Sequence, residues 1–99
     1  MKYKLSVKSL DDIEGIWVYT FKNWSEKQAD RYLNLILAEI EFLSENPESG
    51  KDFRKIRKDY RCSKVKSHLI FFRLLEHKNE IEVIRILHQQ MDIENRLDK

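Results

Sequence analysis

The stretch LIFFRLL, residues 69–75, limits the folds open to this chain more than any other feature. A strand with one face in water alternates between apolar and polar residues, whereas in this stretch only Arg73 is polar. A nearly continuous apolar run of this length is typical of a central strand with both faces covered. Because 99 residues leave room for one modest core, we predict a single domain, residues 1–99, built around a small sheet.

Three further segments have the period of two that strands show, namely residues 2–8, 60–66 and 81–87. The first, KYKLSVK, places Tyr3, Leu5 and Val7 on one face and is expected at an edge of the sheet. The segment EHKNE, residues 76–80, is expected to turn the chain between the last two strands. These assignments predict an antiparallel sheet.

The residues that follow the first of these segments have the apolar spacing of a helix. Positions 10, 13, 16, 17, 20, 21 and 24 fall on one helical stripe. This spacing predicts a helix over residues 10–23, with Ser9 and Asp12 as its capping box.

A second helix is predicted directly after the first. Ser25 and Gln28 form its capping box, and ENPESG, residues 45–50, ends it because proline cannot continue a helix. The short junction predicts that the two helices form an antiparallel hairpin. The predicted fold is therefore α+β, in the order β-α-α-β-β-β, with three final antiparallel strands and a short C-terminal tail or helix.

Several classes of site are excluded or disfavoured by composition. The chain has only two glycines, so a glycine-rich phosphate loop is impossible, and no cluster has the spacing of zinc ligands. A single cysteine, Cys62, cannot form an internal disulfide. The acidic residues of DDIE (residues 11–14) and AEIE (residues 38–41) are expected to face water from the helices. We therefore expect neither a cofactor nor a metal.

The cellular setting is predicted from what the sequence lacks. No run of about 18 apolar residues is present, and the N-terminal segment, MKYKLSVKSLDD, has no long apolar stretch before its acidic residues. We expect a cytoplasmic protein without a membrane partner.

Some apolar residues lie outside the stripes that face the core. Leu35 and Phe42, seven residues apart, lie to one side of the second helix, and two helices can cover only one face of the sheet. Scattered apolar residues on a surface need no explanation. The alternative is a strip for a partner's helix, with something other than the hairpin covering the second face.

Basic charge is concentrated in residues 51–68, which contain eight Lys or Arg and two Asp or Glu. Its densest part consists of Lys51, Arg54, Lys55, Arg57 and Lys58. The segment is either a solvated loop and edge strand, or an electrostatic patch for phosphate or an acidic partner.

Metal-free cleavage of RNA requires a general base, a general acid and cations around the phosphate. The best candidates are Arg61, Arg85 and His88, since His88 ends a strand close to Arg85. His77 falls in a turn, and His68 is expected to make a local hydrogen bond. The sequence places no second acid–base group beside His88, which weakens the case for RNA cleavage. His88 has either a chemical role or a role in recognition.

Four pieces of the sequence together resemble a known family. They are KYKLSVKSLDDIEGIWVYTFKNWSEKQADRYL, ENPESGKDF, DYRCSKVKSHLIFFRL and EVIRILHQQMD, and the last two are the most specific. In these pieces the chain resembles the RelE/ParE toxins of bacterial type II toxin–antitoxin systems, and the ParE branch most of all.

The resemblance implies a function and its partners. ParE-like toxins inhibit DNA gyrase by trapping its cleaved complex with DNA, and a ParD-like antitoxin neutralises them by folding over the toxin. We expect antitoxin contacts at Trp17, Phe21, Leu35 and Phe42. The gyrase-facing surface is expected to include Arg85, His88, Met91, Asp92, Arg96 and Leu97. A homodimer or a toxin–antitoxin hetero-oligomer is possible.

Two other functions remain open. RelE-like members cleave mRNA on the ribosome and commonly use a tyrosine near the C-terminus, but no tyrosine follows Tyr60 here. His88 could replace that tyrosine, so a ribosome-dependent endonuclease is the alternative. The third possibility is a binding module of the same fold without toxicity.

Overall fold

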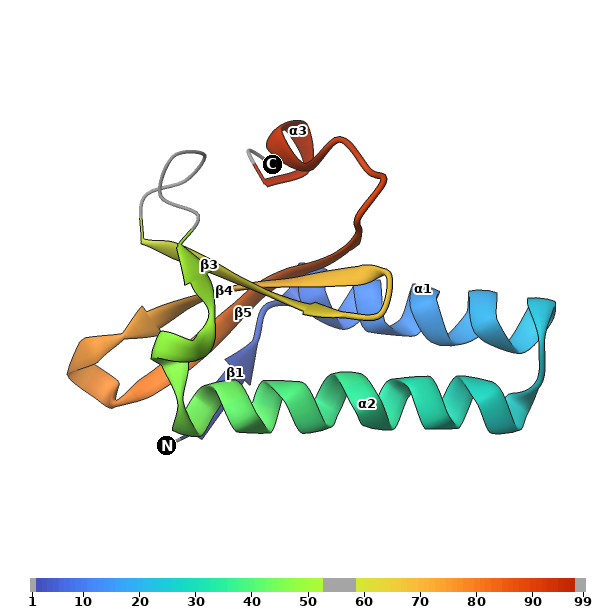
Figure 1. Ribbon diagram of the computed structural model, residues 1–99, viewed down its shortest axis with the longest axis horizontal. Helices are drawn as coiled ribbons and strands as arrows, with labels where there is room; N and C mark the ends of the chain where they lie inside the picture. Colours follow the sequence, from blue (N-terminus) through green and yellow to red (C-terminus); the bar gives the residue numbers. More distant parts are fainter. Residues whose placement is uncertain (1, 53–58, 98–99) are drawn as a thin grey trace.

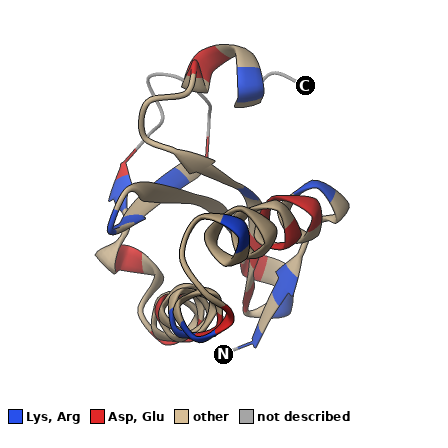
Figure 2. Cartoon of the chain, turned by 90° about the vertical axis from the view of Figure 1, so that its right-hand side faces the viewer, with Lys and Arg blue, Asp and Glu red and all other residues tan. Residues whose placement is uncertain are grey.

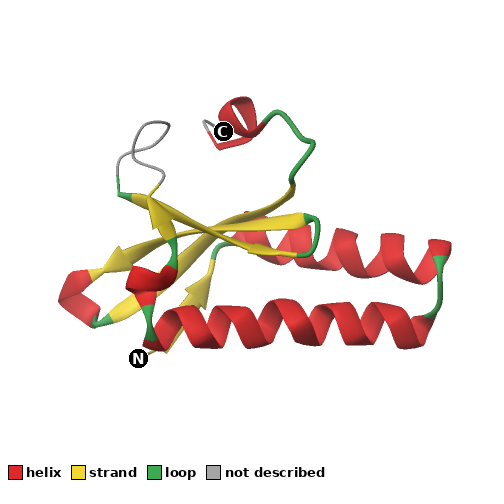
Figure 3. Cartoon of the chain, viewed as in Figure 1, coloured by secondary structure: helices red, strands yellow, loops and turns green. Residues whose placement is uncertain are grey.

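The computed structural model describes residues 2–52 and 59–97. Within them, a five-stranded sheet has the strand order β1-β5-β4-β3-β2 (Figure 1). The elements along the chain are β1 (Lys2–Leu5), α1 (Val7–Asn23), α2 (Glu26–Glu45), the 3-10 turn η1 (Pro47–Ser49), β2 (Lys51–Asp52), β3 (Tyr60–Val65), β4 (His68–Leu75), the 3-10 turn η2 (Glu76–Lys78), β5 (Glu80–His88) and α3 (Ile93–Leu97). Figure 3 shows the same arrangement coloured by secondary structure. The predicted α+β fold is confirmed.

The sheet differs from the prediction in the direction of its first strand. β1 lies at an edge, as predicted, but it pairs with β5 in parallel, from Lys2 opposite Glu80 to Leu5 opposite Val83. The other pairs are antiparallel. A parallel pair requires a long crossover between its strands, and the helical hairpin begins that crossover. The sheet is therefore mixed rather than antiparallel.

The first helix begins one turn earlier than predicted. Ser6, not Ser9, is the N-cap, and its hydroxyl accepts a hydrogen bond from the Ser9 N–H at 3.0 Å. The Ser6 N–H donates to Val83 O, and its hydroxyl donates to Ile84 O at 2.7 Å. Ser6 thus ties the start of α1 to β5, directly after β1 ends at Leu5. Ser9, in the first turn of α1, is buried. The predicted cap of α2 is confirmed, since Ser25 accepts from the Gln28 N–H.

The hairpin of α1 and α2 covers one face of the sheet (Figure 1). The core between the hairpin and the sheet is a cluster of buried side chains from α2, β4 and β5: Ile36, Ile40, Leu43, Ile70, Phe72, Ile81, Val83 and Ile86. No helix among residues 2–52 and 59–97 is long and apolar enough to cross a membrane.

The chain itself covers part of the second face. A smaller cluster of buried residues lies there, formed by Cys62, Phe71, Leu87 and Leu97, with Ile93 packed against it. Figure 1 shows α3, which carries Ile93 and Leu97, on the opposite side of the sheet from the hairpin. The expectation that something other than the hairpin covers this face is therefore met in part by the C-terminal helix.

A β-bulge in β5 sets which side chains share a face. Phe71 is opposite Arg85 and Phe72 is opposite Val83, so Ile84 is the extra residue. Beyond the bulge, Arg85 and Leu87 lie on the α3 face with Phe71, whereas Ile86 and His88 lie on the hairpin face. The bulge thus places Arg85 and His88 on opposite faces.

Candidate functional site

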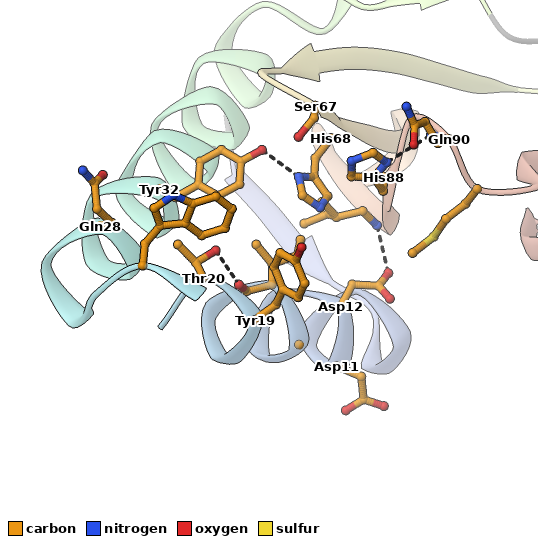
Figure 4. A pocket seen from close by; sticks show the side chains of 15 residues that line it. Asp11, Asp12, Tyr19, Thr20, Gln28, Tyr32, Ser67, His68, His88 and Gln90 are labelled. Atoms are coloured by element: carbon orange, nitrogen blue, oxygen red, sulfur yellow. Dashed lines mark hydrogen bonds between the residues drawn. The ribbon is translucent and has the colours of Figure 1, made fainter. Parts of the chain in front are cut away.

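A groove of about 860 Å³ lies where α1 passes the ends of β4 and β5. Aromatic and histidine side chains form much of its lining, and Figure 4 shows Tyr19, Tyr32, His68 and His88 around it. Trp24 and Met91 also line it. Among the described residues, Asp11 and Asp12 are the charged side chains that line it, and no Lys or Arg does. This part of the groove is therefore poorly suited to phosphate.

Two histidines meet across the strands at this groove. His68 and His88 are opposite each other on β4 and β5, with ring centroids 5.3 Å apart and nearly perpendicular planes. His88 Nδ1 accepts a hydrogen bond from the Gln90 N–H at 3.1 Å (Figure 4). In the neutral ring the proton is therefore assigned to Nε2.

His68 is linked to the second helix through Tyr32. The Tyr32 hydroxyl donates to Val65 O at 3.1 Å and lies 2.6 Å from His68 Nδ1. Since the hydroxyl has one proton, Nδ1 of His68 is assigned as the donor of the second bond. Burial lowers the pKa of His68, and the nearby His88 lowers it further, while Asp12 opposes both. The prediction of a local hydrogen bond for His68 is therefore wrong, because its partner, Tyr32, lies 36 positions away in the chain.

Asp12 joins α1 to the free edge of β5, where β1 has ended. Its Oδ2 accepts from the Ile86 N–H at 2.9 Å and from Arg85 Nε at 2.8 Å, and its Oδ1 accepts from Arg85 Nη2 at 2.9 Å. The hydrogen bond with Asp12 raises the pKa of Arg85 although burial opposes this, and the charge of Asp12 raises it further. Arg85 Nη1 also donates to Arg96 O in α3 at 3.3 Å.

The expectation that the acids of the helices face water is therefore wrong for two residues. Asp12 is only 13% exposed, and Glu39 accepts a hydrogen bond from the Ser63 hydroxyl of β3. The signal for Asp12 was its position four residues before Ile16, on the stripe that faces the sheet.

The three residues considered for RNA cleavage do not converge. Arg61 pairs with Phe72, and His88 pairs with His68, which lies four residues from Phe72 on β4. At about 3.3 Å per residue, this separates Arg61 from His88 by roughly 13 Å along the strand direction. Arg85 lies on the other face and is engaged by Asp12. The three side chains thus form no common centre in this structure.

The residues expected to face gyrase lie near one another at the C-terminal end, but they differ in exposure. Met91, Asp92 and Arg96 are exposed, and His88 is half-buried. Figure 2 shows the acidic and the basic segment of α3, which carries Glu94 and Arg96. Leu97 is 3% exposed and belongs to the second cluster, so its side chain anchors this segment rather than facing outwards.

Of the residues expected to bind the antitoxin, Trp17 and Phe21 belong to α1, and Leu35 and Phe42 belong to α2. Trp17 and Phe21 stack at 5.3 Å, and Trp17 donates to Asp30 on the side of α2 that faces α1. Leu35 and Phe42 share a face with Glu39, which contacts β3. Phe21, Leu35 and Phe42 are exposed.

Most of the predicted basic patch lies outside the described residues. Arg54, Lys55, Arg57 and Lys58 fall in the segment 53–58, and only Lys51 is described, exposed on β2. Lys51 is opposite Cys62. Burial raises the pKa of Cys62 to about 11, against an opposing effect of Lys51. Cys62 is thus a buried thiol rather than an activated nucleophile.

Known proteins similar to this chain agree with its fold and its motifs. Residues 3–93 match the family described as the ParE toxin of type II toxin-antitoxin system, parDE. The chain is 34% identical over 90 residues to Toxin ParE1 of Caulobacter vibrioides, covering 91% of each chain. It is 34% identical over 96 residues to Toxin ParE1 of Mycobacterium tuberculosis, covering 97% of each chain.

A solved structure described as the chromosomal ParDE TA system from P. aeruginosa has the same fold. It matches with a TM-score of 0.76 at 18% identity, over 89% of this chain and 95% of that one. The family match over nearly the whole length and the identity of these relatives confirm the resemblance that the sequence motifs predicted. The chain belongs to the ParE family of toxins of type II toxin–antitoxin systems.

Proposed function

We propose that this toxin inhibits DNA gyrase by trapping its cleaved complex with DNA, and that a ParD-like antitoxin neutralises it. The observation that carries the choice between the two toxic activities is the separation of Arg61, Arg85 and His88. An endonuclease needs its acid–base group within hydrogen-bonding reach of the proton it moves and its cations around the phosphate. Within residues 2–52 and 59–97 these candidate groups are spread over separate parts of the sheet, which supports a toxin that acts by binding.

The surface that we assign to gyrase is the C-terminal segment after β5. Met91, Asp92 and Arg96 are exposed, and His88 lies at the start of this segment. The turn that begins the segment is held by the bonds from Gln89 N to Ser67 O and from Met91 N to His88 O. An ordered, partly charged projection of this kind supports recognition of a macromolecular target.

The surface that we assign to the antitoxin is the outside of the helical hairpin. Phe21, Leu35 and Phe42 are between 42% and 49% exposed. Phe21 belongs to α1, and Leu35 and Phe42 share one face of α2, so a segment that folds on contact and wraps around the hairpin could reach all of them. We expect no preformed partner to be required for the toxin to fold.

A supercoiling assay tests the proposed target. Purified gyrase, relaxed plasmid and ATP are titrated with the toxin, and a denaturing gel follows protein-linked, linearised DNA. Loss of supercoiling with accumulation of cleaved complex is the expected result. His88→Ala is expected to reduce inhibition only a few-fold, because a single contact at the rim of an interface contributes little.

The alternatives give different results in the same set of experiments. Unimpeded supercoiling by a folded toxin, together with cleavage of mRNA on ribosomes, would replace the gyrase proposal with the endonuclease. In that case His88→Ala and Arg85→Ala would each lower cleavage by orders of magnitude. A chain that does not arrest growth when expressed without an antitoxin would be a non-toxic binding module.

A further inference from the structure

We propose that Asp12 is a positioning residue for the C-terminal segment, which it orients through Arg85 without itself touching the target. The inference rests on the proposed function, because the segment it positions is the one assigned to gyrase. Asp12 belongs to α1, and the segment follows β5. The contact between Asp12 and Arg85 joins residues that are 73 positions apart in the chain.

The first step of the argument is the geometry of the ion pair. Both carboxylate oxygens of Asp12 accept from Arg85, from Nε at 2.8 Å and from Nη2 at 2.9 Å. A bidentate pair of this kind fixes the plane of the guanidinium group as well as its position. Both side chains are 13% exposed, so water competes little for these bonds.

The second step is the direction in which Arg85 then acts. With Nε and Nη2 held by Asp12, Nη1 is the nitrogen that donates to Arg96 O at 3.3 Å. Arg96 lies in the last turn of α3, where free carbonyl groups favour a nearby cation. Arg85 therefore bridges α1 and the C-terminal end of α3.

The third step is that little else fixes α3. The helix has five residues, which is too short to be stable alone. Its apolar contacts are those of Ile93 and Leu97 with the second cluster. Loss of the bridge is thus expected to let α3 leave the sheet more often while the core under the hairpin stays folded.

The chain contains its own reporter for this movement. Cys62 is the single cysteine and is 7% exposed in the cluster that Leu97 completes. A thiol reagent such as DTNB reaches it only when that face opens. The labelling rate at fixed pH therefore measures how often α3 leaves the sheet.

The test compares Asp12→Asn with Glu14→Gln. Asparagine retains an oxygen for the Ile86 N–H but loses the charge that holds Arg85, whereas Glu14 is an exposed acid on the same helix. We expect Asp12→Asn to speed labelling on the order of tenfold, and Glu14→Gln to change it less than twofold. Leu97→Ala, which removes the apolar anchor, gives the upper limit of the rate.

Local opening is separated from global unfolding by the dependence of labelling on urea. An increase caused by movement of α3 alone exposes little surface and depends weakly on urea, while an increase caused by unfolding depends on it steeply. In the double variant Asp12→Asn, Arg85→Gln the effects should not add, because both changes remove one contact. Unchanged labelling in Asp12→Asn, or an increase with the urea dependence of global unfolding, would overturn the inference.

The same variants are then measured in the supercoiling assay. Asp12→Asn is expected to need at least fivefold more toxin for half-inhibition, and Glu14→Gln the same amount as the unchanged chain. Faster labelling without weaker inhibition would overturn the role of Asp12 in positioning the target surface. If the unchanged toxin does not inhibit gyrase, the proposed function fails, and the labelling experiment alone decides whether Asp12 orients α3.

Discussion

Leu97 of α3 and Phe71 of β4 lie in one buried cluster on the face of the sheet that the helical hairpin leaves open. Leu97 is 3% exposed and Phe71 is fully buried. The last helix therefore covers part of the second face of β4, a strand that is apolar on both faces. This relationship makes the C-terminal segment part of the fold as well as a candidate surface.

Replacing Leu97 by Ala is expected to lower the free energy of unfolding by about 2–3 kcal/mol, because the change removes buried methyl groups and leaves a cavity beside Phe71. Urea unfolding followed by circular dichroism measures the difference. Glu94→Gln, on the exposed side of the same helix, should change the midpoint little. A Leu97→Ala midpoint equal to that of Glu94→Gln would show that α3 adds no stability.

The two glycines are expected to respond to alanine in opposite directions. A Cβ at Gly50 would lie 2.5 Å from Cζ of Phe72, a buried ring that cannot move aside, so Gly50→Ala should destabilise by about 1–3 kcal/mol. Gly15 lies within α1 and has nothing within 4 Å of its Cβ position, so Gly15→Ala should stabilise by about 0.5–1 kcal/mol. Thermal melts of both variants provide the comparison, and two shifts of the same sign would contradict it.

Stability is expected to fall as the pH drops below about 6.5, in part through His68. Burial, and then His88, lower the pKa of His68 in the folded chain below its ordinary value of 6.5. Between those two pKa values the unfolded chain binds more protons, so acidification favours unfolding, while above them His68 contributes no pH dependence.

Urea unfolding at pH 7.5 and pH 5.5 measures this effect, with His68→Gln as the test variant. The loss of stability on acidification should be smaller in His68→Gln than in the unchanged chain. His77→Gln serves as the control because His77 is exposed in η2. An equal loss in all three proteins would exclude His68 as a source of the pH dependence.

Antitoxin binding is expected to depend on both helices of the hairpin. Phe42→Ala and Phe21→Ala should each weaken binding of the cognate antitoxin more than tenfold, because exposed aromatic residues often contribute most of the affinity of an interface. Calorimetric titration with the antitoxin's C-terminal peptide measures this, with Asn34→Ala as an exposed control on α2. Unchanged affinity in both phenylalanine variants would exclude the outside of the hairpin as the binding surface.

Local patterns in the sequence predicted most of the secondary structure. The apolar run of residues 69–75, the period of two in residues 81–87 and the helical stripes before them depend on side chains that are neighbours within one element. The cap at Ser25 is local in the same sense and was predicted correctly. The start of α1 was predicted one turn late because Ser6 is held by β5, a strand more than 70 residues away.

The sequence by itself determined the two long helices, the order of β1, β3, β4 and β5, the apolar central strand and the membership of the ParE family, but not the two-residue strand β2. Only the tertiary structure decided that β1 pairs in parallel with β5, that Asp12 binds Arg85, that Tyr32 binds His68 and that Leu97 is buried. Each of these contacts joins residues far apart in the chain, and which partner a side chain meets depends on how the hairpin and α3 pack on opposite faces of one sheet. Periodicity and capping are properties of neighbouring residues and carry no information about such partners.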